Sequence, residues 1–112
     1  MIKKYKIHKL LFLIIIIIIV LILLLINNSN NHNQNVVDNC INLCKMNLDK
    51  NVDLSKGPCL SNNVANDWVC DVAHNPREDI DNNIQNQCSD YLNNSKHHFV
   101  ELTPNCKLIR AI

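Results

Sequence analysis

An unbroken apolar run from Leu10 to Ile26 constrains this chain more than any other feature of its sequence. The run is 17 residues long, includes six consecutive isoleucines and contains no polar or charged residue. As an α-helix it would extend over about 26 Å, which is enough to cross the hydrocarbon core of a thin bilayer. The run therefore predicts a single transmembrane helix formed by residues 10–26.

The length and flanks of the run bear on whether it is kept as an anchor or removed as a signal peptide. It exceeds the apolar core of a typical signal peptide, which has about 7–15 residues. The sequence Asn27-Asn28-Ser29 that follows does not supply the small-x-small pattern of a cleavage site. We therefore predict a retained signal-anchor helix. The alternative is a secreted small Cys-rich protein, released after cleavage.

Charge on the two sides of the run predicts its orientation. The first nine residues hold four basic side chains and no acidic one, namely Lys3, Lys4, Lys6 and Lys9. No Lys or Arg occurs in residues 27–35. By the positive-inside rule, residues 1–9 form a basic cytoplasmic N-terminus, and the rest of the chain is extracellular or lumenal. That exported part carries seven basic and ten acidic residues, so we expect no nucleic acid partner.

The part after the run divides into a polar stretch and a Cys-rich domain. Residues 27–35 read NNSNNHNQN and include no apolar side chain that a core could bury. This composition predicts a flexible stalk. The remaining residues, 36–112, are enough for one small extracytoplasmic domain.

All six cysteines lie in residues 36–112: Cys40, Cys44, Cys59, Cys70, Cys88 and Cys106. An even number in a short exported domain is typical of a disulfide framework. Three bridges at about 2–4 kcal/mol each would stabilise a core that has few large apolar residues. Fifteen pairings are possible, and the sequence leaves them open.

Local patterns predict a small disulfide-rich α+β domain with two short helices and a C-terminal β-hairpin. Asp38 is a suitable N-cap for a helix in which Cys40, Ile41, Cys44 and Leu48 share a face. Asn75 and Pro76 predict the start of a second helix, which would continue to about Leu92.

Between and after these predicted helices, the sequence predicts a loop, a segment of ambiguous type and a hairpin. Residues 54–63 read as a turn or loop around Gly57-Pro58, and residues 65–74 fit either a strand or a helix, with Trp68 as a core residue. Residues 97–102 and 106–112 predict the two strands of the hairpin, joined by a turn at Thr103-Pro104-Asn105. Cys106 would tie this hairpin to a helix.

One polar stretch, residues 71–81, concentrates side chains that are capable of acid–base or binding chemistry. We take it as a speculative functional face formed by His74, Arg77, Glu78, Asp79 and Asp81. A histidine beside carboxylates is an arrangement that hydrolases use. However, acidic residues in the first turn of a helix are also common for electrostatic reasons, and the single glycine excludes a phosphate loop. We therefore assign no catalytic residue.

A metal site and a glycosylation site are the other motifs considered. Cys40, Cys44, Cys70 and His74 together would be an acceptable zinc set, but disulfide formation would remove the three thiolates. We expect no metal ligand and no cofactor. Asn93-Asn94-Ser95 is an acceptor motif for N-linked glycosylation in a polar segment, which makes Asn93 the candidate site.

Together these patterns predict a single-pass membrane protein that displays a binding or interaction domain on the extracytoplasmic side. Its ligand or protein partner is not named by the sequence. A metal-binding or hydrolytic domain centred on His74 is the alternative from a different functional class.

Overall fold

The computed structural model describes the backbone of residues 2–112 and the side chains of residues 6–29 and 31–112. The chain forms two compact units, which divide between Asn33 and Gln34. The helix α1 (Ile2–Asp49) supplies all of the first unit and the beginning of the second.

In the first unit, α1 carries the apolar run. Its most apolar window has a mean hydropathy of 3.7, so by length and composition this helix is able to cross a membrane. Residues 27–35, for which the sequence predicts a flexible stalk, are helical in this structure. Because a helix is costly to nucleate but cheap to extend, helical segments on both sides can carry the helix through a short asparagine-rich stretch.

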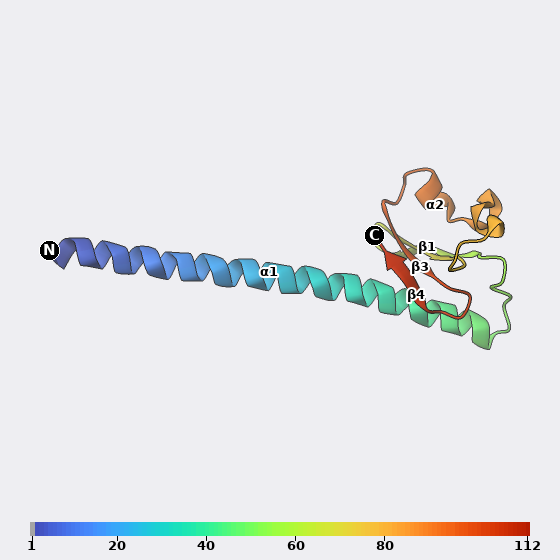
Figure 1. Ribbon diagram of the computed structural model, residues 1–112, viewed down its shortest axis with the longest axis horizontal. Coiled ribbons are helices and arrows are strands. Elements are labelled where there is room, and N and C mark those ends of the chain that lie inside the picture. The colour runs from blue at the N-terminus through green and yellow to red at the C-terminus, as the bar shows by residue number, and fades with distance from the viewer. Residues whose placement is uncertain (1) are drawn as a thin grey trace. The chain divides into compact units, whose positions relative to one another are not determined.

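The second unit, Gln34–Ile112, combines the last turns of α1 with a four-stranded sheet (Figure 1). The strands are β1 (Cys59–Ala65), β2 (Trp68–Val72), β3 (His98–Leu102) and β4 (Leu108–Ala111), and they lie in that order across the sheet. The pairs β1–β2 and β3–β4 are antiparallel, whereas β2 and β3 are parallel. The segment between the parallel strands, residues 73–97, is called the crossover segment below.

The core lies between one face of the sheet and the end of α1. Alternation along β2 directs Trp68, Cys70 and Val72 to this face, and β3 adds Val100 and Leu102. The whole cluster consists of Val36, Val37, Cys40, Cys44, Leu54, Trp68, Cys70, Val72, Val100, Leu102 and Cys106. The prediction that Trp68 is a core residue is therefore confirmed.

Three disulfides link the elements, as the cysteine count predicts. Cys40 and Cys44 of α1 are bonded to Cys70 on β2 and to Cys106 before β4, and the third bridge joins Cys59 on β1 to Cys88. The two cysteines of α1 thus have different partners, and Cys106 ties the β3–β4 pair to a helix. The Cys40–Cys70 and Cys44–Cys106 bonds hold α1 to two neighbouring parts of the sheet.

The α+β class is confirmed, but the predicted elements differ from the structure in detail. Residues 54–63 were expected as a loop, yet Cys59 begins β1, and the expected hairpin is one half of a four-stranded sheet. The second predicted helix is replaced by two 3-10 turns, η1 (Asp79–Asn82) and η2 (Ile84–Asn86), and one α-helical turn, α2 (Ser89–Leu92). Asparagine-rich sequence forms α-helix poorly, and its side chains bond the backbone instead: Asn83 accepts from the Gln85 N–H group.

The buried face of α1 also differs from the predicted one. Cys40 and Cys44 are fully buried, but Leu48 is exposed. Val36 and Val37, one turn before the predicted start, are buried in its place. Asp38 is not an N-cap, because the helix continues far upstream of it.

Candidate functional site

The second face of the sheet carries a cleft, whose floor is made of two rows of side chains across β2, β3 and β4. In one row Asp71 pairs with Glu101, which pairs with Arg110. In the other row Val69 pairs with Phe99, which exchanges backbone hydrogen bonds with Ile112. The floor therefore has a charged row and an apolar row, two residues apart along each strand and so on the same face of the sheet.

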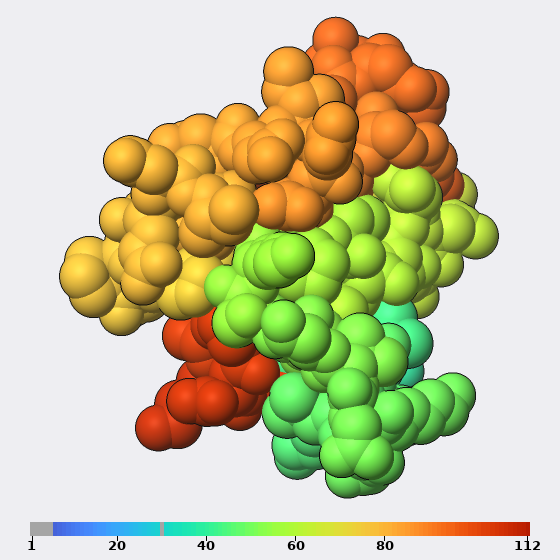
Figure 2. Space-filling model, turned by 90° about the vertical axis from the view of Figure 1, so that its right-hand side faces the viewer, coloured from blue at the N-terminus to red at the C-terminus, as the bar shows by residue number. Residues whose placement is uncertain are grey.

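The crossover segment supplies the walls of this cleft. The cleft has a volume of about 320 Å³ and is lined by Val69, Asp71, Arg77, Gln87, Cys88, Tyr91, Phe99, Glu101, Arg110 and Ile112. Figure 2 shows the crossover segment (yellow to orange) at the surface, beside the loop and strand that precede it in the chain (green to yellow-green). The Cys59–Cys88 disulfide joins this segment to β1 and so fixes one wall to the sheet.

Glu101 is the buried centre of the charged row, and two arginines neutralise it. Arg77 donates from Nη1 to Oε1 of Glu101 at 2.7 Å, and Arg110 donates from Nε to Oε2 at 2.8 Å. The Glu101 side chain is only 5% exposed, so these charge-assisted bonds replace the water that it has lost. Arg110 also lies over the Phe99 ring, with its guanidinium carbon 4.9 Å from the ring centroid.

Asp71 is the charged group of the cleft that has no cationic partner within the described side chains. Burial raises the pKa of Asp71 to about 7, and the charges of Glu101 and Asp81 add to this rise. The Val72 N–H group and Arg77 oppose it. A half-buried carboxyl group that titrates near neutral pH in a cleft is the kind of group found at functional sites.

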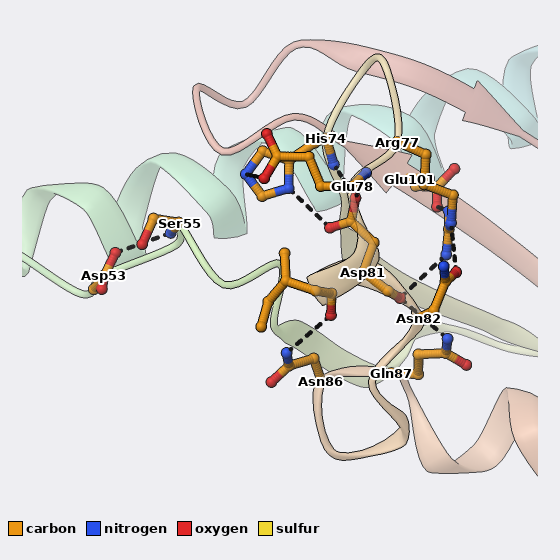
Figure 3. Close-up of polar contacts among 11 residues, drawn as sticks. Asp53, Ser55, His74, Arg77, Glu78, Asp81, Asn82, Asn86, Gln87 and Glu101 are labelled. Atoms are coloured by element: carbon orange, nitrogen blue, oxygen red, sulfur yellow. Dashed lines mark hydrogen bonds and ion pairs between the residues drawn. The ribbon is translucent and has the colours of Figure 1, made fainter.

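A second polar cluster lies at the start of the crossover segment, around Asp81 (Figure 3). The Asp81 carboxylate is almost fully buried and accepts the backbone N–H groups of His74 and Glu78, each at 2.9 Å. Its second oxygen lies 2.9 Å from Nδ1 of His74. The other ring nitrogen of His74 is 3.8 Å from a Glu78 oxygen. Asp81 therefore holds the loop and orients the imidazole.

The electrostatics of this pair follow from these contacts. The hydrogen bond that the His74 ring donates to Asp81 raises the pKa of His74, with a further rise from the charges of Asp81 and Glu78, although burial opposes it. Burial also acts to raise the pKa of Asp81, but the Glu78 and His74 N–H groups and the His74 ring outweigh it, and this pKa is lowered. The protonated imidazole therefore stabilises the fold at acidic pH, and this contribution is lost as the pH rises through the folded-state pKa of His74.

Gly57 permits the close approach of the loop to Asp81. Its φ angle is +65°, in the left-handed region that favours glycine. A Cβ atom at this position would lie 2.6 Å from Oδ1 of Asp81 and 2.9 Å from the Val72 carbonyl oxygen. The only glycine of the chain is thus required where the backbone before β1 passes the Asp81 carboxylate.

The His74–Asp81 pair has the histidine and the carboxylate that a hydrolase would use, so the question is whether a nucleophile lies beside it. Within the described part of the chain, no serine, threonine or cysteine side chain is hydrogen-bonded to the His74 ring. The cysteine-based zinc set is excluded because Cys40, Cys44 and Cys70 are all in disulfides. Cys59 and Cys88 lie near Asp71, but they are bonded to each other and therefore offer no thiolate to a metal ion.

The structure brings together four of the five residues of the predicted functional face. His74, Glu78 and Asp81 form the cluster just described, and Arg77 links it to the cleft by donating from Nη2 to the Asp81 carbonyl oxygen and from Nη1 to Glu101. Asp79 is exposed on η1 and takes no part in these hydrogen bonds. The glycosylation candidate Asn93 is exposed and follows α2.

Three residues of the cleft were not predicted as site residues from the sequence: Asp71, Glu101 and Arg110. A signal was present, because Asp71 and Glu101 each interrupt an apolar strand sequence, WVCDV and HFVEL. Period-two alternation gives both acids the phase opposite to that of the core residues Cys70 and Val100. Only the register between β2 and β3 shows that the two are neighbours.

Comparison of this chain with protein-family models, with curated proteins and with solved structures finds no significant match to any of them.

Proposed function

We propose that this chain is a single-pass membrane protein whose second unit is a recognition domain on the extracytoplasmic side. The membrane segment is formed by residues 10–26, with residues 1–9 in the cytoplasm. The domain binds an extracellular or lumenal ligand through the sheet cleft. The observation that carries this proposal is the combination of one apolar run, residues 10–26 of α1, with six paired cysteines that all follow this run in the sequence.

Export of the domain is supported by its disulfides and by the charge pattern. Disulfides persist in oxidising compartments and are rare in the cytosol. Here every cysteine of the chain is paired, and no free thiol is left. The lysines before the apolar run favour a cytoplasmic N-terminus, which would place all six cysteines across the membrane.

A recognition role is supported by the cleft. The disulfides and the sheet hold its floor, so a ligand would bind to a preformed surface. Phe99, Tyr91 and Ile112 offer apolar surface beside charged groups. The unpaired Asp71 carboxylate costs stability when it ionises, and retaining such a group is typical of functional sites.

Glycosylation in a eukaryotic secretory host tests the orientation. Asn93 is exposed, so the full-length chain is expected to carry an endoglycosidase-sensitive glycan if the domain is lumenal. Asn93→Gln should remove this glycan, and Ser95→Thr should keep it because the acceptor motif is preserved. The glycosylated chain should remain in membranes after an alkaline carbonate wash.

The outcomes separate the alternatives. An unmodified chain that remains in membranes would contradict the proposed orientation. A glycosylated chain that is released into the medium would show that the apolar segment is cleaved and that the protein is secreted. Asn27→Gln serves as a matched control, since its acceptor motif directly follows the membrane segment and should not be modified in a retained anchor.

A further inference from the structure

We propose that the cleft binds a small primary ammonium ion carried on an apolar body, with the ammonium on Asp71 and the body against Val69, Phe99 and Ile112. This inference rests on the recognition role proposed above and gives the chemical class of the ligand. It is independent of which side of the membrane the domain occupies.

The first step is the charge of the floor. Glu101 already uses both carboxylate oxygens, one for each arginine. Each of the three guanidinium nitrogens of Arg77 already donates a hydrogen bond, Nη1 to Glu101, Nε to Asn82 and Nη2 to the Asp81 carbonyl oxygen. Arg110 is about half exposed, so its remaining N–H groups can be hydrated by water. The group of the charged row that burial leaves without a counter-ion is therefore Asp71.

The second step is the kind of cation. A Ca²⁺ or Mg²⁺ ion would require about six oxygen ligands and a Zn²⁺ ion would require thiolate, imidazole or carboxylate ligands, whereas the groups beside Asp71 are the two sulfur atoms of a disulfide and an already neutralised Glu101. An ammonium group needs only a few acceptors for its three donors. Asp71 provides one, and Gln87 provides another, since its side-chain N–H group is used on the Asp81 carbonyl oxygen and its side-chain oxygen accepts no hydrogen bond from the described residues.

The third step is the body that carries the ammonium. The apolar row lies next to the charged row, and Tyr91 packs edge-on against Phe99 with the ring centroids 5.0 Å apart. Tyr91 and Ile112 are exposed, so a ligand that covers them would bury apolar surface. A volume of about 320 Å³ is suited to a ligand with one ring or a short branched chain.

Phenethylamine is the probe for this site. The full-length chain would be placed in phosphatidylcholine nanodiscs, and the methyl NMR signals of Val69 and Ile112 would be followed during titration, with empty nanodiscs as the blank. We expect saturable shifts of both signals. Asp71→Asn should weaken binding about tenfold or more, whereas Asp79→Asn, at an exposed carboxylate outside the cleft, should leave it unchanged.

The pH dependence gives a second readout. Aliphatic amines stay protonated up to about pH 10, so the probe keeps its charge while Asp71 titrates. With the pKa of Asp71 at about 7, apparent affinity at pH 6 should be about tenfold weaker than at pH 8, because only the ionised fraction binds. The charged groups that face Asp71 are Glu101, Arg110, Arg77 and Asp81, and the two acids among them accept hydrogen bonds, Glu101 from the two arginines and Asp81 from backbone N–H groups.

Matched neutral and anionic probes determine whether the inference stands. Equal binding of 2-phenylethanol and phenethylamine would overturn it, since an apolar cleft alone would then explain the affinity. Tighter binding of phenylacetate would overturn it by showing that the arginines dominate. Absence of saturable phenethylamine binding would overturn it too, whereas the orientation proposed above would still be decided by glycosylation at Asn93.

Discussion

Replacing both Cys44 and Cys106 by serine is expected to remove about 4 kcal/mol from the free energy of unfolding of the domain. This bridge spans 62 residues, the largest separation of the three, so it removes the most freedom from the unfolded chain. A domain of this size has a total stability of about 4–12 kcal/mol, so about a third or more of it would be lost. The loss is severe because five of the fourteen buried apolar residues are themselves half-cystines and large aliphatic side chains are few.

Urea unfolding followed by Trp68 fluorescence measures this effect. Trp68 is the single tryptophan, is buried in the core and stacks on His98 with the ring centroids 4.8 Å apart, so its emission reports the packed state. The control is the Cys59→Ser, Cys88→Ser pair, whose bridge spans 29 residues and lies at the cleft instead of in the core. An unchanged unfolding midpoint for the Cys44 and Cys106 double variant would contradict the role given to this bridge.

Asp71→Asn is expected to make the domain more stable at pH 8 and nearly unchanged at pH 4. The pKa of Asp71 is raised to about 7 in the folded state, against an ordinary value of 3.8. Between these values the folded chain holds a proton that the unfolded chain has released, so the stability of the parent protein falls as the pH rises through this interval. Asparagine cannot ionise. The free energy of unfolding of Asp71→Asn should therefore exceed that of the parent protein by about 2–4 kcal/mol more at pH 8 than at pH 4, after allowance for the partial exposure of the side chain.

The same fluorescence assay at the two pH values provides the test. His74 and Asp81 titrate in both proteins, so their contributions cancel in the comparison. Asp79→Asn, at an exposed position on η1, should shift stability by no more than about 0.5 kcal/mol at either pH. If Asp71→Asn destabilised the domain at pH 8, the carboxylate would have a stabilising partner, and the account of the cleft would be wrong.

The disulfide framework could be predicted from the sequence, but its pairing could not. Six cysteines in a segment predicted to be exported imply three bridges, and helical spacing indicated that Cys40 and Cys44 face the same way. Their partners, Cys70 and Cys106, are set by the sheet. The sheet in turn depends on the parallel pairing of β2 and β3, which brings together residues about 30 positions apart. Local patterns contain no information on that pairing.

The crossover segment shows how side-chain chemistry can override a helix signal. Asn75, Pro76 and Glu78 have the spacing of a helix start, and this pattern led to the prediction of a second helix. In the structure Asp81 accepts the N–H groups of His74 and Glu78, so the backbone turns around its carboxylate and forms 3-10 turns. The sequence did indicate that His74, Arg77, Glu78 and Asp81 act together, because they are close along the chain.

The cleft could not be predicted from local sequence patterns, for a related reason. Its charged row takes one residue from each of three strands, and Asp71 is 30 positions from Glu101 and 39 from Arg110. A residue that interrupts an apolar strand can be noticed in the sequence, but its neighbours depend on strand order and register. Asp71 is left unpaired because Arg110 on β4 lies opposite Glu101 on β3, and Arg77 of the crossover segment also bonds to Glu101.

The most direct test of the central claim is the intact mass of the full-length protein from a secretion-competent host, denatured and alkylated without reductant. A membrane-anchored, disulfide-stabilised domain predicts a mass that includes the apolar segment, with no alkyl group on any of the six cysteines. Alkylation at several cysteines would contradict the disulfide framework. A chain that begins near Asn30 would contradict the anchor and show that the protein is secreted.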